Sequence, residues 1–162
     1  MRTVKEILES IHGEGGRGFV STSNSKPSLP QSIRVLSGAL VRIHSEYTRL
    51  KDTDKFGRVR CFTCDKVMPW KESQEGHYIP RGKLPTKFEN KNTHAQCPNC
   101  NMMLAGNLEV YRVRLDARYG KGTADDMLAL SKVKYRPTRA DYQSQIAFYK
   151  SAVKKAKKRL DI

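Results

Sequence analysis

Apolar residues recur along two stretches of the chain with the spacing of an amphipathic helix. The first stretch runs from Gln31 to residue 51, and the second runs from about Thr138 to Leu160. Steps of three and four residues between apolar positions predict one buried face on each helix. The two faces comprise Ile33, Leu36, Leu40, Ile43, Tyr47 and Leu50, and Tyr142, Ile146, Tyr149, Val153, Ala156 and Leu160. We expect these helices to pack on each other or on the cysteine-containing core, with dimerisation through them as the alternative.

Shorter patterns organise the remainder of the chain. Residues 3–11 fit a short helix, and residues 12–30 have the glycine, serine and proline content of a flexible linker. Residues 107–120 and 123–132 predict two further helices, the second with Thr123 as its N-cap. The chain then divides into a helix with a linker, an amphipathic helix, a cysteine-containing core and C-terminal helices with a basic tail, at 1–30, 31–55, 56–120 and 121–162.

The charge of the chain indicates which class of partner it binds. The 162 residues include 31 Lys and Arg against 16 Asp and Glu, a net charge of +15. Such an excess indicates a polyanionic partner, nucleic acid above all, with an anionic membrane surface as the rival. No apolar run approaches a membrane span and no signal-peptide pattern opens the chain, so we expect a soluble protein of the cytoplasm, that of the host cell if a phage encodes it. The predicted phosphate-binding residues of the tail, unless they only form a solvated helix end, are Lys154, Lys155, Lys157, Lys158 and Arg159.

All the cysteines fall in two C-x-x-C pairs, Cys61 with Cys64 and Cys97 with Cys100. Tetrahedral zinc favours this tight pairing, whereas disulfides do not require it, and a redox C-x-x-C is the alternative. Simple zinc ribbons place about 15–20 residues between their pairs. Here 32 residues intervene, so the predicted structural zinc site closes the base of a larger unit.

The insertion between the pairs contains EGHYIPRG at residues 75–82. Four thiolates complete a closed zinc site, so His77 is available for other chemistry. An unperturbed histidine has a pKa near 6.5, which suits a general base at neutral pH. Asn101 directly follows the second pair, and its amide oxygen is a hard ligand of the kind that Mg²⁺ accepts. A base on a strand and a hard ligand on the following helix would make a one-metal nuclease.

The order of these motifs resembles a known class of enzymes. C-x-x-C, G-H and N-x-x-x-x-C-x-x-C-N follow one another as in the zinc-bearing HNH nucleases, whose core is a ββα-metal finger. Residues 61–119 are similar, more closely, to the phage lambda NinG (Rap) recombination endonuclease family. The similar blocks are CFTC at 61–64, GHY at 76–78, NTHAQCPNCN at 92–101, GNL at 106–108 and YRVRL at 111–115.

The resemblance implies a fold and an activity. The fold is a small α+β structure, a zinc-clamped HNH-like finger flanked by amphipathic basic helices. The activity is that of a structure-specific endonuclease, dependent on Mg²⁺ or Mn²⁺, that cuts branched recombination intermediates including Holliday junctions and D-loops. By the same resemblance His77 activates the attacking water, Asn92 fastens the loop of the finger, and Asn101 binds the catalytic metal.

One position departs from many HNH enzymes. Gly76 stands where they have an aspartate that also binds the metal, and either Glu75 or His94 is a candidate replacement. For His94, contact with phosphate or a structural role is the alternative. Arg81 is a candidate for binding the scissile phosphate or stabilising transition-state charge, with an ordinary surface arginine as the alternative. Lys83 is a further candidate for DNA contact.

The expected partners are branched DNA and a second copy of the chain, with no membrane and no small-molecule cofactor. Cutting two opposed strands of a four-way junction suits a two-fold symmetric dimer, and the helix at 31–51 is the first candidate for its interface. The rival function is a noncatalytic, zinc-dependent DNA-binding accessory of recombination or replication. Within the nucleases, the alternative is an HNH endonuclease with less selectivity for branched structure.

Overall fold

The protein has a small α+β fold, which a computed structural model describes for residues 32–162. The helix predicted at 3–11 and the linker predicted at 12–30 lie outside these residues. The regular elements are α2 (Ile33–Leu50), β1 (Arg58–Arg60), β2 (Val67–Pro69), the 3₁₀-helix η1 (Trp70–Glu72), β3 (Gln74–His77), β4 (Thr93–Gln96), the π-helix η2 (Asn99–Met103), α3 (Leu108–Tyr119), α4 (Thr123–Leu130) and α5 (Arg139–Leu160).

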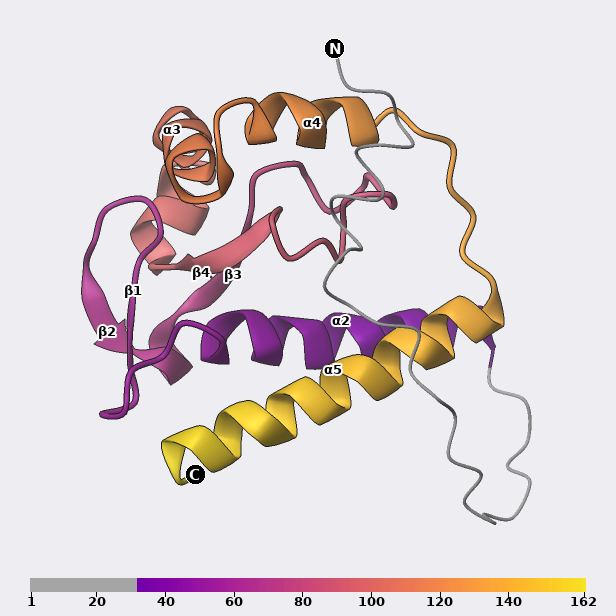
Figure 1. Ribbon diagram of the computed structural model, residues 1–162, viewed down its shortest axis with the longest axis horizontal. Coiled ribbons are helices and arrows are strands. Elements are labelled where there is room, and N and C mark those ends of the chain that lie inside the picture. Colours follow the sequence, from indigo (N-terminus) through magenta and orange to yellow (C-terminus); the bar gives the residue numbers. More distant parts are fainter. Residues whose placement is uncertain (1–31) are drawn as a thin grey trace.

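These elements form three layers around one short hairpin. The β3–β4 hairpin lies in the middle, with α3 and α4 on one side and the long α2–α5 pair on the other (Figure 1). The β1–β2 hairpin lies at one end of this stack. Within the described residues, none of the helices has both the length and the apolar content that crossing a membrane requires.

The two long amphipathic helices pack on each other, as one of the two sequence alternatives predicted. Leu36 and Leu40 of α2 share a buried cluster with Tyr142 and Tyr149 of α5. A second cluster joins the end of α2 to the end of α5. Apart from Ile33, which is 49% exposed, the predicted apolar face of α2 is therefore covered within the chain, and little of it is left for a dimer interface.

The β3–β4 hairpin sets the geometry of the candidate site. The strands are antiparallel, with Gly76 opposite His94 and His77 opposite Thr93. Side chains alternate between the two faces of a strand, so Glu75 and His77 share one face of β3. A Cβ atom on Gly76 would overlap the side chain of Gln96, which occupies that space. Packing of Gln96 therefore accounts for the glycine at this position.

The helices on the other side close over the hairpin. Their core includes Tyr111 and Leu115 of α3 and Met127 of α4, all fully buried. Gly120 ends α3 as predicted, with a φ of 103°. Thr123 is not the N-cap of α4 but its first residue, because Gly122 takes the cap position with a φ of 92°.

Candidate functional site

The four cysteines form one cluster that fits a zinc ion. Cys61 and Cys64 lie in the turn after β1, while Cys97 follows β4 and Cys100 lies in η2. Their Sγ atoms all lie within 4.8 Å of one another, and those of Cys64 and Cys97 are 3.7 Å apart. Zn–S bonds of about 2.3 Å in a tetrahedron place neighbouring sulfurs about 3.8 Å apart. The donor atoms and their spacing therefore suit structural zinc, which would clamp the turn after β1 to the end of β4.

The cysteine cluster also fixes the position of Asn101. The Asn101 backbone N–H donates to the carbonyl of Cys97 at 3.0 Å, one residue beyond the last cysteine. Its side-chain Nδ2 donates to Oε1 of Gln74 in β3 at 2.8 Å. This bond leaves the amide oxygen Oδ1 without a hydrogen bond among residues 32–162, as a ligand for a cation would require.

His77 has the surroundings of a neutral base. Its Nε2 lies 3.1 Å from the carbonyl oxygen of Lys87, which can only accept, so Nε2 carries the ring proton. The lone pair is then on Nδ1, 3.4 Å from Nε of Arg81. Burial lowers the pKa of His77 below its usual value, although the charge of Glu75 acts in the opposite direction. The imidazole is therefore neutral at pH 7 and able to accept a proton.

Asn92 fastens the loop that carries the carbonyl partner of His77. Its side chain is fully buried. Oδ1 accepts from the N–H of Ile79 at 2.7 Å, while Nδ2 donates to the carbonyls of Ile79 and Thr86 at 3.1 and 2.9 Å. These bonds tie both ends of the segment between β3 and β4, and they therefore fix Lys87 relative to His77.

An open hollow of about 350 Å³ brings several of the candidate residues together. It is lined by Ser45, Arg49, Ser73, Gln74, Glu75, Arg81 and Asn101. Nη2 of Arg81 lies 3.4 Å from Oε2 of Glu75, and the same guanidinium reaches Nδ1 of His77. His77 does not line the hollow itself, but Arg81 links it to the hollow.

Glu75 has a buried carboxylate that is hydrogen-bonded to residues of α2, the helix that packs against the hairpin. Its Oε1 lies 2.5 Å from Nδ1 of His44 and 3.4 Å from Oγ1 of Thr48, both on α2. Burial acts to raise the pKa of Glu75, but the hydrogen bond to His44 and the nearby charge of Arg81 outweigh it, so the pKa is lowered. Glu75 is therefore ionised at neutral pH.

His44 was not among the residues predicted to form the site. Its position four residues after Leu40 and four before Thr48 places it on the buried face of α2, which is the feature that could have identified it. A histidine and a threonine on such a face require buried polar partners. The partner, Glu75, is 31 residues away, so only the fold identifies it.

His94 lies in the core, in surroundings that fit the structural role left open by the sequence and not a metal ligand. It is fully buried, and its ring stacks on Phe62 with 3.8 Å between centroids. Nδ1 lies 2.9 Å from the hydroxyl of Tyr111 and Nε2 lies 2.8 Å from that of Tyr119. Both nitrogens are thus hydrogen-bonded, and burial holds the pKa of His94 well below 6.5. His94 has no lone pair free for a metal.

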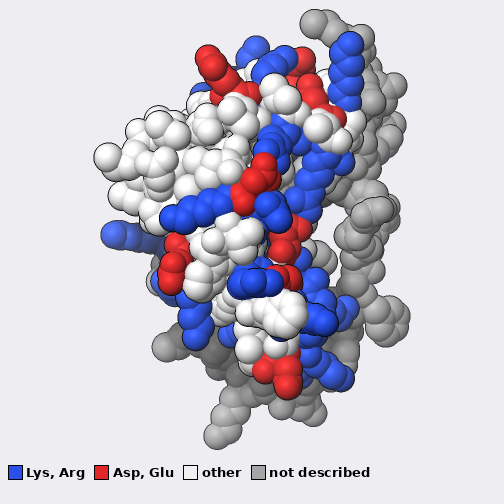
Figure 2. All heavy atoms as spheres, turned by 90° about the vertical axis from the view of Figure 1, so that its left-hand side faces the viewer, with Lys and Arg blue, Asp and Glu red and all other residues white. Residues whose placement is uncertain are grey.

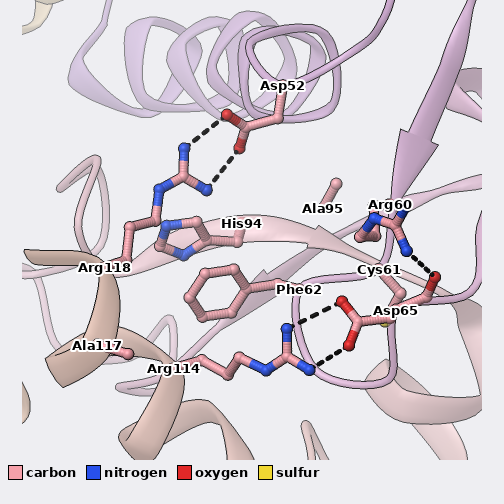
Figure 3. Close-up of a pocket in the computed structure, with 10 residues that line it drawn as sticks. All are labelled: Asp52, Arg60, Cys61, Phe62, Asp65, His94, Ala95, Arg114, Ala117 and Arg118. Carbon is pink, nitrogen blue, oxygen red and sulfur yellow. Dashed lines mark hydrogen bonds and ion pairs between the residues drawn. The ribbon is translucent and has the colours of Figure 1, made fainter.

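A second cavity, of about 370 Å³, lies beside His94 and Phe62 (Figure 3). Arg118 pairs with Asp52 across it, and Arg114 pairs with Asp65. Each guanidinium in these two pairs faces a carboxylate, so their charges largely cancel. Of the predicted site residues, only Cys61 and His94 line this cavity.

The predicted DNA-binding cations have different environments. Lys83, Lys154, Lys155 and Lys158 are exposed. Lys157 instead pairs with Glu46 of α2 at 2.6 Å. Arg159 donates to the carbonyls of Leu50, Lys51 and Thr53, which end or follow α2. The tail therefore offers three exposed lysines, while its other two cations join α5 to α2.

The surface around β1, β2 and α3 is also mixed in charge. Figure 2 faces this end of the molecule and shows lysines and arginines interspersed with acidic residues, beside an area of uncharged residues. This face is not a uniform basic patch.

Comparison with known proteins places this geometry in a family. The family model described as Bacteriophage Lambda NinG protein matches residues 31–159, which is most of the chain. The chain belongs to the NinG family. It is 32% identical over 82 residues to the ninG protein of Escherichia phage lambda and, equally, to that of Salmonella phage P22. Over 53 residues it is 40% identical to the ninG protein of Enterobacteria phage H19B.

These NinG relatives are matched only in part. The alignment with the lambda protein covers 50% of this chain and 38% of the relative, and that with the H19B protein covers 32% and 26%. The chain thus spans well under half the length of the curated relatives it matches. No solved structure matches the chain significantly.

Proposed function

We propose that this NinG-family protein is a structure-specific DNA endonuclease that cuts branched recombination intermediates, such as Holliday junctions and D-loops, by metal-dependent hydrolysis. One observation carries the proposal: the carboxylate of Glu75 and the amide oxygen of Asn101 line one hollow, and Arg81, which also lines it, reaches the neutral His77. The resemblance to HNH nucleases gives His77 and Asn101 the same kind of chemistry.

Glu75 and Asn101 are the proposed ligands of Mg²⁺ or Mn²⁺. Both line the hollow, and both offer oxygen donors of the type that these cations prefer. Glu75 takes the place of the aspartate that Gln96 excludes at Gly76. A bound divalent ion would stabilise charge on the scissile phosphate and on the leaving 3′ oxygen. Arg81, which now pairs with Glu75, would transfer its hydrogen bonds to the phosphate when DNA enters.

His77 is the proposed general base. Its Nδ1 would accept a proton from the attacking water, and its Nε2–H would remain bonded to the carbonyl of Lys87. That second bond holds the ring in one tautomer and one orientation throughout the reaction. Asn92 acts as a positioning residue, since it fixes the loop that contains Lys87.

Phosphate contacts would hold the DNA without reading its bases. The exposed lysines at 83, 154, 155 and 158 and the net charge of +15 suit a backbone-directed, salt-sensitive interaction. Selectivity would then depend on the shape and deformability of the branched DNA. A two-fold dimer, formed through a surface other than the apolar face of α2, would cut opposed strands.

A cleavage comparison tests the proposal. A four-way junction, a flap and a linear duplex, all of scrambled sequence, are incubated with the protein and Mg²⁺ or Mn²⁺. We expect preferential cutting of the branched substrates, and a loss of about 10²–10⁴-fold in His77→Ala, which keeps its junction affinity. Cleavage retained by His77→Ala removes the histidine as the base. Binding without any cleavage by the wild type favours the noncatalytic accessory, and equal cutting of all three favours a less selective nuclease.

A further inference from the structure

Three consecutive apolar side chains project into solvent next to the candidate site. Met102 is 65% exposed, Met103 78% and Leu104 51%, and the run begins directly after Asn101. Single exposed apolar residues are ordinary, but a run of three is unfavourable unless a partner covers it. We call these three residues the apolar wedge.

The wedge is anchored at both ends. At its start η2 begins between two cysteines of the zinc cluster, and the Leu104 N–H donates to the carbonyl of Asn99 at 2.9 Å. At its end the chain reverses through three consecutive residues with positive φ before α3 begins. These residues are Ala105, Gly106 and Asn107, with φ of 47°, 90° and 50°. The fold therefore holds the three side chains outward at a defined place.

That place borders the proposed cleavage site. Nε2 of Gln74 lies 3.3 Å from Sδ of Met102, and Oε1 of the same Gln74 accepts from Asn101. The hollow on the other side of this contact contains Arg49 and Arg81. Apolar side chains beside guanidinium groups fit a partner that presents phosphates and flat apolar surfaces together. Nucleic acid has both.

We propose that the apolar wedge inserts between the bases at a DNA branch point and so positions the branch over the site. This inference rests on the proposed function and deepens it. Bases at a branch have incomplete stacking, so opening them costs less than opening a continuous duplex. Methionine and leucine side chains unstack base steps in several DNA-binding proteins, and methionine adapts to irregular surfaces. The wedge thereby favours branched over linear DNA without reading sequence.

Fluorescence of 2-aminopurine tests the wedge independently of cleavage. The probe is placed at the crossover of a four-way junction and, separately, in the middle of a linear duplex, and binding is measured in Ca²⁺ with the full chain. We expect wild-type protein to raise the fluorescence at the crossover but not in the duplex. Met103→Ser and the triple variant Met102→Ser, Met103→Ser, Leu104→Ser lose this rise. In the triple variant the preference for junction over duplex falls roughly tenfold, about 1.4 kcal/mol.

Phe148→Ser is the matched control, because Phe148 is 48% exposed on α5, in a different layer of the fold. It should behave as the wild type. Zinc content and the helical circular dichroism signal show that each variant is folded, and the single Met103→Ser change serves if the triple variant is not.

Junction binding by the wild type with no fluorescence change overturns the wedge and leaves the proposed function intact. Failure of the wild type to prefer junctions overturns both. A wild-type dimer that the triple variant converts to a monomer, by sedimentation, identifies the surface as an interface between two copies and overturns the wedge.

Discussion

The β3–β4 hairpin carries two histidines whose surroundings are opposite. His94 faces the α3–α4 side, where Tyr111 and Tyr119 bond both of its nitrogens and no solvent reaches it. His77 is half-buried next to the open hollow, where one nitrogen bonds a backbone carbonyl and the other meets Arg81. The same kind of side chain therefore stabilises the fold on one side of the hairpin and is the proposed general base on the other.

The register of the hairpin produces this difference. His94 pairs with Gly76, so it lies across from the residue next to His77, and neighbouring residues of a strand point to opposite faces. The absence of a side chain at Gly76 admits Gln96 to the closed face. The closed face of this short hairpin thus contributes to stability, while its open face carries the proposed chemistry.

Breaking the cysteine cluster should produce the largest effect, because a zinc ion bound there would clamp the turn after β1 to the end of β4. Cys61→Ser is expected to lose zinc and the ordered hairpin, since binding to structural zinc sites contributes about 10–16 kcal/mol in zinc-finger peptides. Metal analysis and chemical denaturation measure both losses, and a chelator should reproduce them in the wild type. A Cys61→Ser protein that stays folded without zinc contradicts the structural role of the cluster.

The hydrophobic pattern predicted the helices well and the site less completely. The spacing of Leu36, Leu40, Tyr142 and Tyr149 is a local property, so α2, α5 and their buried faces followed from it. The cysteine cluster was predicted equally well, because two C-x-x-C pairs are typical of a tetrahedral zinc site.

Contacts between distant residues could not be derived in this way. The His44–Glu75 bond depends on how α2 packs under β3, and the burial of His94 depends on Tyr111 and Tyr119, which lie in the next helix. Motif spacing identifies two histidines in one hairpin without specifying which one lies in the core and which one contacts Arg81 beside the hollow. Strand register and helix packing, which are properties of the whole fold, make that choice.

His94→Leu should destabilise the protein without damaging the site. The change removes the hydrogen bonds of His94 to Tyr111 and Tyr119, and each such bond contributes about 1 kcal/mol. Tyr111 keeps its bonds to the carbonyls of Gly76 and Asn92, and Tyr119 is only partly buried, so we expect a loss of about 2 kcal/mol in the free energy of unfolding.

Urea denaturation measures this loss, with His77→Ala as the matched control from the open face. The control should lose little stability and most of its cleavage, while folded His94→Leu keeps its cleavage rate. The reverse pattern, with His94→Leu stable but inactive, would indicate that His94 takes part in cleavage.

The contribution of His94 to the free energy of unfolding should also depend on pH. Burial, Lys51 and Arg118 hold the pKa of His94 well below 6.5 in the folded protein, whereas the unfolded chain titrates near 6.5. Protons then bind the unfolded chain preferentially, so this contribution to stability is complete above pH 6.5 and decreases as the pH falls. Between pH 6.5 and 5 the wild type should lose up to about 2 kcal/mol through His94, at 1.36 kcal/mol per pH unit.

Denaturation curves at pH 7 and pH 5 measure that loss, and His94→Leu should show less of it than His77→Ala. An identical pH dependence in both variants would mean that His94 is accessible to protons in the folded state.

Glu75→Gln should have the smallest of these effects and is the most specific test of the open face. Glutamine keeps the size of the side chain and its contact with His44 but removes the charge proposed to bind the divalent ion. We expect Mn²⁺ to bind at least roughly tenfold more weakly, a change of about 1.4 kcal/mol, because one of two protein ligands loses its charge. Electron paramagnetic resonance of free Mn²⁺ measures this affinity without reference to cleavage.

Glu72→Gln supplies the control, because Glu72 lies on η1, three residues before Glu75, and is exposed. It removes the same charge close by and should leave the affinity for Mn²⁺ almost unchanged. Equal weakening in the two variants would mean that the ion responds only to the general field of the protein. Weakening confined to Glu75→Gln, together with an unchanged zinc content, places the carboxylate that the hairpin buries beside His44 at the metal, where the glycine at position 76 has no ligand to offer.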